Sequence, residues 1–93
     1  MNVRKIEPEE MKVAHFTKHD VLRDEEERRD RIRKLIKAVV LSHNEHDEVG
    51  IVIKLESGEV IETYCNLIDF ADDYVMITGG TIIPLISVVD VEF

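Results

Sequence analysis

Hydrophobic and polar residues alternate along most of the second half of the chain, residues 48–93. Val49, Ile51, Ile53 and Leu55, for example, stand at every other position. A period of two puts alternate side chains on one face of a β-strand, whereas the positions on one helix face recur every 3.6 residues. The pattern therefore predicts short strands, which we place at residues 49–55, 60–68, 74–78, 81–84 and 89–93.

Turn-forming residues separate these strands. Ser57-Gly58 lies between glutamates, and Gly79-Gly80 can take the positive φ angles of a two-residue hairpin turn. Pro84 has no N–H to give to a ladder, so it belongs at a strand end or a sheet edge. Apolar residues occupy both faces of the strand at 60–68, which predicts a long, bent strand that is partly covered on each side.

A helical period precedes the strands. Its apolar residues fall at i, i+3, i+4, i+7 and i+8 and form one stripe, made of Ile32, Leu35, Ile36, Val39 and Val40. Asp24 and Glu27 have the spacing of a capping box. We therefore expect an amphipathic helix at residues 24–43, with the stripe packed on the strands and the polar first two turns in solvent.

Residues 1–23 allow two interpretations. Pro8 followed by two glutamates is a helix start, which predicts a short helix. The run MKVAHF reads equally well as a short strand, or as part of an N-terminal arm that orders on a partner.

These elements together predict the fold class. We expect one α+β domain, mostly β, in which the amphipathic helix at 24–43 is followed by a five-stranded antiparallel SH3/Sm-like small barrel at 48–93. No apolar run approaches the roughly 20 residues of a membrane-spanning helix, so we expect no membrane partner. The first residues lack the apolar core of a signal peptide, and we expect a cytoplasmic protein.

Charge divides the chain into unequal halves. The net charge is −8, but residues 1–46 hold 11 Lys/Arg against 10 Asp/Glu, whereas residues 47–93 hold Lys54 alone against 10 Asp/Glu. A strand half with a balance of −9 repels phosphates at long range. This charge argues against nucleic acid as the ligand of the strands and favours a protein partner with a basic surface.

Two resemblances follow from these patterns. The segment from Val49 to Asp69, with LESGEVIE between apolar strands and a helix before it, resembles the first conserved half of Sm-like proteins. Taken over roughly residues 30–93, the chain is also similar to the Rof family of acidic Sm-like barrels, which bind the termination factor Rho. The ending IPLISVVDVEF is similar to the C-terminal part of the YolD-like family of small Gram-positive bacterial proteins.

The resemblance to Sm-like proteins implies a uridine pocket that this chain lacks. RNA-binding Sm proteins carry an aromatic or His residue and an Asn after their second strand, where Ala71 and Asp73 stand here. Their Arg-Gly pair before the last strand is replaced by TIIPLIS, and the YolD-like Lys-Trp pattern is missing because the chain has no Trp. A Rof-like acidic barrel instead implies protein contacts through the carboxylates Glu56, Glu59, Glu62, Asp69, Asp72 and Asp73.

A basic block in the predicted helix supports an alternative. Its arginines would contact phosphates in an Sm-like nucleic-acid-binding module, and the block includes Arg28, Arg29, Arg31 and Arg33 within residues 28–37. We favour a solvated helix face, since acidic residues in the first turn and basic residues later suit the helix dipole. An exposed edge at Thr81–Ile83 would also allow a homo-oligomer or ring.

Enzyme and metal chemistry have little support in the sequence. Cys65 stands in a predicted strand and is expected to be a small core residue. His15 and His19 have the spacing of two ligands on one helical turn, and His43 and His46 follow later, but we favour exposed polar residues. We therefore expect no catalytic residues, no metal and no cofactor, and a non-enzymatic regulatory or adaptor protein.

Overall fold

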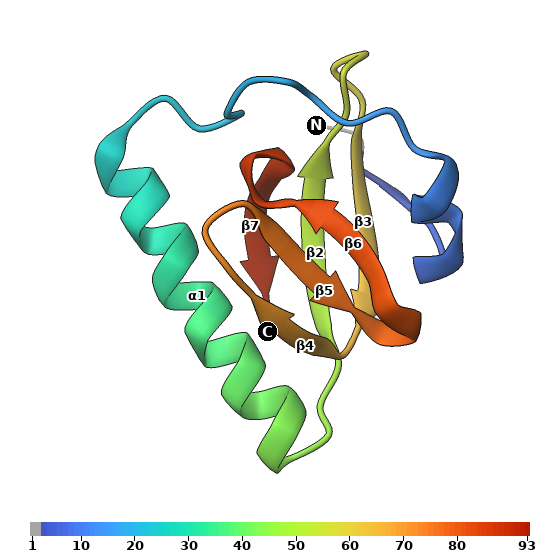
Figure 1. Cartoon of the computed structure of the whole chain (residues 1–93), viewed down its shortest axis with the longest axis vertical. Coiled ribbons are helices and arrows are strands. Elements are labelled where there is room, and N and C mark those ends of the chain that lie inside the picture. The colour runs from blue at the N-terminus through green and yellow to red at the C-terminus, as the bar shows by residue number, and fades with distance from the viewer. Residues whose placement is uncertain (1–2) are drawn as a thin grey trace.

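The computed structural model describes residues 3–93 and contains one α-helix and seven strands in two sheets (Figure 1). The four-stranded sheet has the order β1-β3-β2-β7, and the three-stranded sheet has the order β4-β5-β6. All neighbouring strands are antiparallel except β1 and β3. The fold is therefore α+β with mostly antiparallel strands, which confirms the coarse fold class.

Four strands build the first sheet: β1 (Val3–Lys5), β2 (Val49–Lys54), β3 (Val60–Cys65) and β7 (Val88–Glu92). Ile51, Ile53 and Ile61 are fully buried because the period of two turns them toward the core. The turn between β2 and β3 contains Gly58 at φ +91°, which a residue with a Cβ rarely adopts.

Three strands build the second sheet: β4 (Leu67–Phe70), β5 (Tyr74–Ile77) and β6 (Thr81–Pro84). The long strand expected at 60–68 bends at Asn66 and belongs to both sheets, as β3 before the bend and β4 after it. The Asn66 N–H donates to Thr78 Oγ1 (2.9 Å), and its side-chain amide donates to the Asp47 carbonyl (3.0 Å). The bend is thus held from both sides.

The expected closed barrel is not confirmed. A short 3-10 helix, η3 (Leu85–Ser87), joins β6 to β7, and within residues 3–93 no ladder pairs these two strands. Pro84 ends β6 and cannot donate a hydrogen bond, so the chain turns the corner before a ladder between β6 and β7 can form. The edge strands β6 and β7 of the two sheets are therefore not paired with each other.

The helix α1 (Glu25–Asn44) begins one residue after its expected start, with Asp24 as its N-cap. The Asp24 carboxylate accepts a hydrogen bond from the Glu26 N–H (3.0 Å), which satisfies one of the free donors at the helix start. The helix packs against β7 and β4 and covers that side of the sheets (Figure 1). It is too polar to cross a membrane, and the described residues include no other helix of sufficient length.

The buried face of α1 differs from the expected stripe. The core side of the helix consists of Arg31, Leu35, Ala38 and Ser42, while Ile36 and Val40 are 52% and 50% exposed. The helix is therefore rotated relative to the expectation, and part of the apolar stripe faces outward. The physical reason is Arg31, whose burial the sequence pattern does not indicate.

The segment before α1 lies on the sheets. β1 adds a short parallel strand beside β3, and a 3-10 helix, η1 (Pro8–Val13), follows with Pro8 in its first turn and Met11 buried. The short helix at Pro8 is thus present, and the part of the expected arm at residues 1–2 lies outside the described residues. Phe16 then forms an isolated bridge with Leu55.

Candidate functional site

The six carboxylates expected to bind a partner lie at three places. Glu56 and Glu59 lie in the turn between β2 and β3, and Glu62 lies on β3, where it is buried. The remaining three lie at the end of β4 and in the turn to β5, and all are exposed: Asp69, Asp72 and Asp73. The structure therefore gathers the three aspartates, which we call the aspartate turn, and leaves the glutamates elsewhere.

Glu59 is engaged by the N-terminal strand. Its two carboxylate oxygens accept hydrogen bonds from Arg4, at 2.9 Å from Nε and 3.1 Å from the terminal nitrogen. These hydrogen bonds and the charge of Arg4 lower the pKa of Glu59. Because Arg4 balances its charge, Glu59 adds little to an acidic surface.

Glu62 is buried beside a second carboxylate. Its residue is 4% exposed, and one carboxylate oxygen has no hydrogen-bond partner within the described chain. Glu92 pairs with Gly50 of β2, and a Glu62 carboxylate oxygen lies 2.7 Å from the place where a Cβ of residue 50 would stand, so both carboxylates lie beside the glycine of β2. Burial, followed by the hydrogen bond and charge of Glu92, raises the pKa of Glu62, and Lys5 opposes this shift.

The basic block of α1 is engaged within the chain. Arg28 Nε donates to the Leu22 carbonyl (2.8 Å), and the exposed Arg29 and Arg33 form ion pairs with carboxylates of the helix itself. Those carboxylates are three or four residues away, the spacing at which helical side chains meet. The arginines at 28, 29 and 33 are thus accessible but not free of partners.

Arg31 belongs to the interior. Its guanidinium donates two hydrogen bonds to the Asp20 carboxylate, at 2.7 and 2.8 Å, and a third to the Val88 carbonyl at 3.0 Å. Only 3% of its side chain is exposed. Of the four expected phosphate contacts, the structure therefore places this one inside the fold, where it joins α1 to β7.

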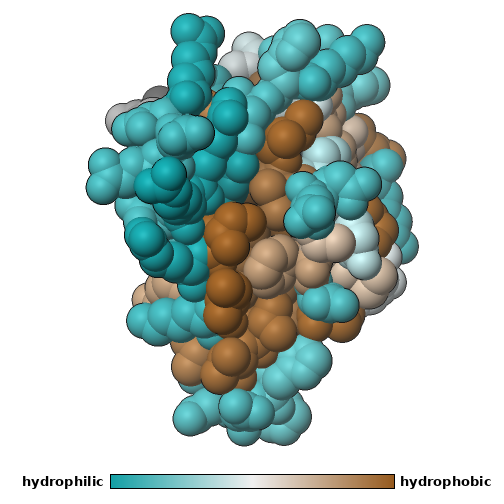
Figure 2. Space-filling view, turned by 60° about the vertical axis from the view of Figure 1, so that its left-hand side comes forward, coloured by the Kyte–Doolittle hydropathy of each residue, from teal (hydrophilic) through white to brown (hydrophobic). Residues whose placement is uncertain are grey.

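An apolar strip runs along the junction of α1 and β4. Ile36 and Val40 are four residues apart on one helix face, and His43 extends the same side with a hydrogen bond from its ring to the Ile68 carbonyl (2.7 Å). Ile68 is 38% exposed. Figure 2 shows the exposed apolar surface next to the polar face of the helix. We call Ile36, Val40 and Ile68 the apolar strip.

The aspartate turn follows the apolar strip along the chain. Asp69 directly follows Ile68 within β4, and Asp72 and Asp73 follow in the turn between β4 and β5. An uncharged centre with a charged rim is the usual arrangement of a surface that binds another protein. The sequence indicates the aspartates but not the strip, because Ile36 and Val40 read as part of the buried stripe.

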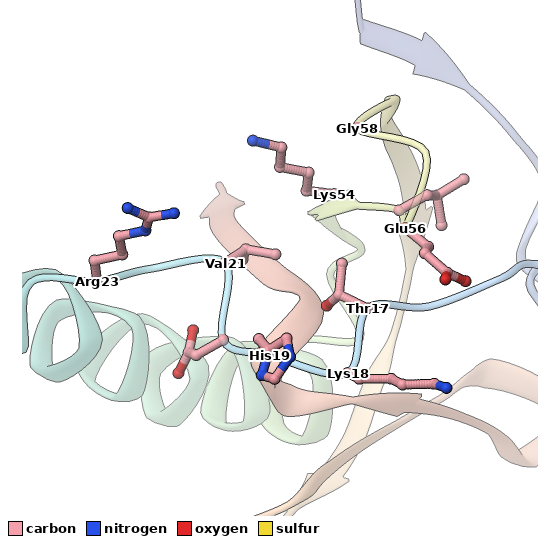
Figure 3. Close-up of a pocket in the computed structure, with 10 residues that line it drawn as sticks. Thr17, Lys18, His19, Val21, Arg23, Lys54, Glu56 and Gly58 are labelled. Atoms are coloured by element: carbon pink, nitrogen blue, oxygen red, sulfur yellow. The ribbon is translucent and has the colours of Figure 1, made fainter.

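A cavity of about 430 Å³ lies on another side of the molecule (Figure 3). It opens between the segment that precedes α1 and the hairpin of β2 and β3. Its lining residues include four basic or imidazole side chains: Lys18, His19, Arg23 and Lys54. The sequence could not indicate this cavity, since its walls are about thirty residues apart in the chain.

Cys65 is a core residue, as expected. The thiol is buried, and burial, together with the nearby charge of Glu48, raises its pKa to about 12. It therefore stays protonated at neutral pH and is a poor nucleophile. Among the residues that the structure describes, no group of three or more His, Cys, Asp or Glu side chains is arranged to hold a metal ion.

Comparisons with protein-family models, with curated proteins and with solved structures each give no match to this chain.

Proposed function

We propose that this chain is a non-enzymatic, cytoplasmic adaptor or regulatory protein that binds a basic segment of another protein. The contact surface is the apolar strip together with the aspartate turn. The single observation that carries the proposal is the outward position of Ile36 and Val40 on α1, next to Ile68. Burial of apolar surface is the main favourable term in most protein–protein association.

Charge specifies the partner. The aspartate turn is exposed, and no ion pair within the described chain engages Asp69, Asp72 or Asp73. A partner segment with Lys or Arg beside apolar residues would complement both parts of the surface. We propose this surface in place of the six carboxylates expected from the sequence, because the charge of Glu59 is balanced by Arg4 and Glu62 is buried.

The small-barrel resemblance agrees with this role. The order of the strands from β2 to β6 and the bend at Asn66 support an SH3/Sm-like arrangement that is open at one edge. A Rof-like protein of this kind would occupy a basic, nucleic-acid-binding surface on its partner. The acidic balance of residues 47–93 supports the same direction of binding.

Nucleic-acid binding by the helix is the second candidate function. Each of Arg28, Arg29 and Arg33 has a carboxylate partner, and Arg31 is buried. Contact with phosphates would require the exposed arginines to exchange these partners. A ring-shaped oligomer would still provide a route to RNA, and light scattering after size-exclusion chromatography would detect it.

Affinity capture from an extract of the source organism tests the proposal, using the wild-type chain and matched variants. A partner captured by the wild type should be lost with Ile36→Asp and weakened with Asp72→Asn/Asp73→Asn. The control is Val13→Asp, since Val13 is 80% exposed and lies in η1, away from the strip. Capture should also weaken as salt increases, because charge contributes to binding.

Retention of the partner by Ile36→Asp would refute the proposed surface. The proposed surface would also be refuted if Val13→Asp abolished capture as completely as Ile36→Asp does. Ile36 and Val13 are exposed, so we expect both single variants to fold, and circular dichroism checks this.

A further inference from the structure

Most basic side chains of the chain are engaged with groups of the chain itself. Of the 12 Lys and Arg residues, six form ion pairs: Arg4, Arg28, Arg29, Arg31, Arg33 and Lys34. Lys5 and Lys37 lie over the rings of Tyr64 and Phe93. Within the described residues, this leaves four cations without either kind of partner: Lys12, Lys18, Arg23 and Lys54.

Three of these four cations line the same cavity. Lys18 and Arg23 come from the segment before α1, and Lys54 comes from the end of β2. Lys54 is also the one basic residue of the acidic strand half. In Figure 3, Lys54 and Arg23 extend from opposite walls toward the space above Val21. Like charges that converge without an anion repel each other, so this arrangement favours a negatively charged occupant.

The walls of the cavity are held in place by the fold. The Val21 N–H donates to the Ile86 carbonyl (2.9 Å), and the Glu56 N–H donates to the His15 carbonyl (3.0 Å). Asp20 is fixed by Arg31 on the next element. A site whose walls are fixed before binding loses little conformational entropy when a ligand enters.

The acidic residues that line the cavity do not neutralise all of its positive charge. Asp20 is already engaged by Arg31 and Arg28, at 2.7 and 3.3 Å. Glu56 lies with Lys18 at the other end of the cavity in the view of Figure 3. Among the described residues that line the cavity, no carboxylate therefore compensates the two cations at the end between Arg23 and Lys54.

We propose that this cavity binds the phosphate group of a small phosphorylated metabolite. A volume of about 430 Å³ is in the range of small-molecule sites. Val21 and Leu55 supply apolar contacts, and within the described chain no Phe, Tyr or Trp ring lines the cavity, so a short aliphatic body fits the rest of the ligand better than a nucleobase does.

The overall charge favours a small anion over a polyanion. A net charge of −8 repels a long nucleic acid across the whole surface. A small ligand inside the cavity is close to Arg23 and Lys54, whereas charges farther away than about 8 Å are screened at physiological ionic strength. The site is distinct from the apolar strip, so the inference goes beyond the proposed protein contact.

Amide NMR of the whole chain tests the site, with inorganic phosphate and glycerol 3-phosphate titrated at constant ionic strength. We expect saturable shifts confined to residues 17–23 and 54–58, with half-saturation below about 10 mM. Glycerol 3-phosphate should bind more tightly than phosphate alone because its body contacts Val21 and Leu55. Lys54→Gln and Arg23→Gln should each weaken binding by about tenfold, as expected for loss of one charged hydrogen bond.

The matched control is Lys12→Gln, which removes the same charge from the one unengaged cation that does not line the cavity. It should leave the affinity unchanged. The inference is overturned if the shifts stay linear at all concentrations, or if Lys12→Gln weakens binding as much as Lys54→Gln. A single-stranded oligonucleotide that binds more tightly than glycerol 3-phosphate would overturn the assignment to a small metabolite.

Discussion

The Asp20 carboxylate and the Arg31 guanidinium, eleven residues apart, form two hydrogen bonds of 2.7 and 2.8 Å. Arg31 also reaches the Val88 carbonyl, so this pair connects the segment before α1, the helix and β7. It fixes the rotation of α1 that leaves Ile36 and Val40 exposed, and it holds one wall of the basic cavity. Both proposed binding surfaces therefore depend on one buried ion pair.

Asp20→Asn should destabilise the fold by about 3 kcal/mol, because it leaves the buried Arg31 without its carboxylate. Denaturant unfolding followed by circular dichroism measures the change. Asp30→Asn is the matched control, since it makes the same substitution in an exposed pair with Arg33 and should cost less than about 1 kcal/mol. Equal losses from the two substitutions would contradict the structural role of Asp20.

Stability should fall in acid in a manner that depends on Asp20. Burial alone would raise the pKa of Asp20, but the hydrogen bonds from Arg31 and the Leu22 N–H, with the charges of Arg31 and Arg28, hold it below its usual range. Its stabilisation is therefore complete above the unfolded pKa of about 3.9 and is lost as pH falls through the lower folded value. Unfolding curves are measured from about pH 2, roughly two units below that pKa, to about pH 7. The loss of stability due to Asp20 should appear in the wild type but not in Asp20→Asn.

Glu62→Gln should stabilise the protein at neutral pH. The raised pKa means that the folded state prefers protonated Glu62, so stability falls as pH rises from the unfolded value of about 4.3 through the higher folded value. Glutamine removes the buried charge beside Glu92, and the gain should be about 1 kcal/mol at pH 7. The gain should vanish below about pH 4, and an equal gain at all pH values would argue against ionisation as its cause.

Gly50→Ala should reveal the contact between β2 and Glu62. A Cβ at this position would lie 2.7 Å from a Glu62 carboxylate oxygen and 3.2 Å from the Tyr64 ring. We expect a cost of about 1 kcal/mol from this crowding. In the Glu62→Ala background the cost should fall, because only the Tyr64 ring then stays close to the new Cβ, and a double-mutant cycle measures the coupling. Additive effects would show that Glu62 is not the obstacle.

Cys65 should react with thiol reagents only after unfolding. Its thiol is buried and has a pKa of about 12, so the reactive thiolate is scarce at pH 8. An aromatic disulfide reagent should titrate one thiol in denaturant and react at least about a hundredfold more slowly under native conditions, since the rate follows the open population. Rapid native labelling would contradict the buried position of Cys65.

The strands could be predicted because their signals are local. The alternation in residues 49–53 and the Gly79-Gly80 turn depend on neighbouring residues alone, and the structure has strands and a turn at these places. The helix at 24–43 was also predicted within one residue at each end. Periodicity and turn chemistry thus account for the elements and for the coarse fold class.

The orientation of α1 could not be predicted, because it depends on a contact distant in sequence. Arg31 reads as a solvent-facing residue until Asp20 supplies a buried partner, and Asp20 stands in a segment without a hydrophobic period. The helical period therefore predicts Ile36 and Val40 on the core face, although they are half exposed. The basic cavity was missed for a similar reason, since Lys54 meets Arg23 only in the folded chain.

The Asp47 carbonyl accepts hydrogen bonds from the hydroxyl of Ser42 (3.2 Å) and from the amide of Asn66 (3.0 Å). Ser42 belongs to the last turn of α1, and its oxygen also accepts from the Leu67 N–H (3.0 Å) at the start of β4. These hydrogen bonds therefore connect the end of α1, the bend at Asn66 and the segment just before β2. Opening of the three-stranded sheet would break these hydrogen bonds, so we expect amide hydrogen exchange to show both sheets losing protection in a single cooperative transition.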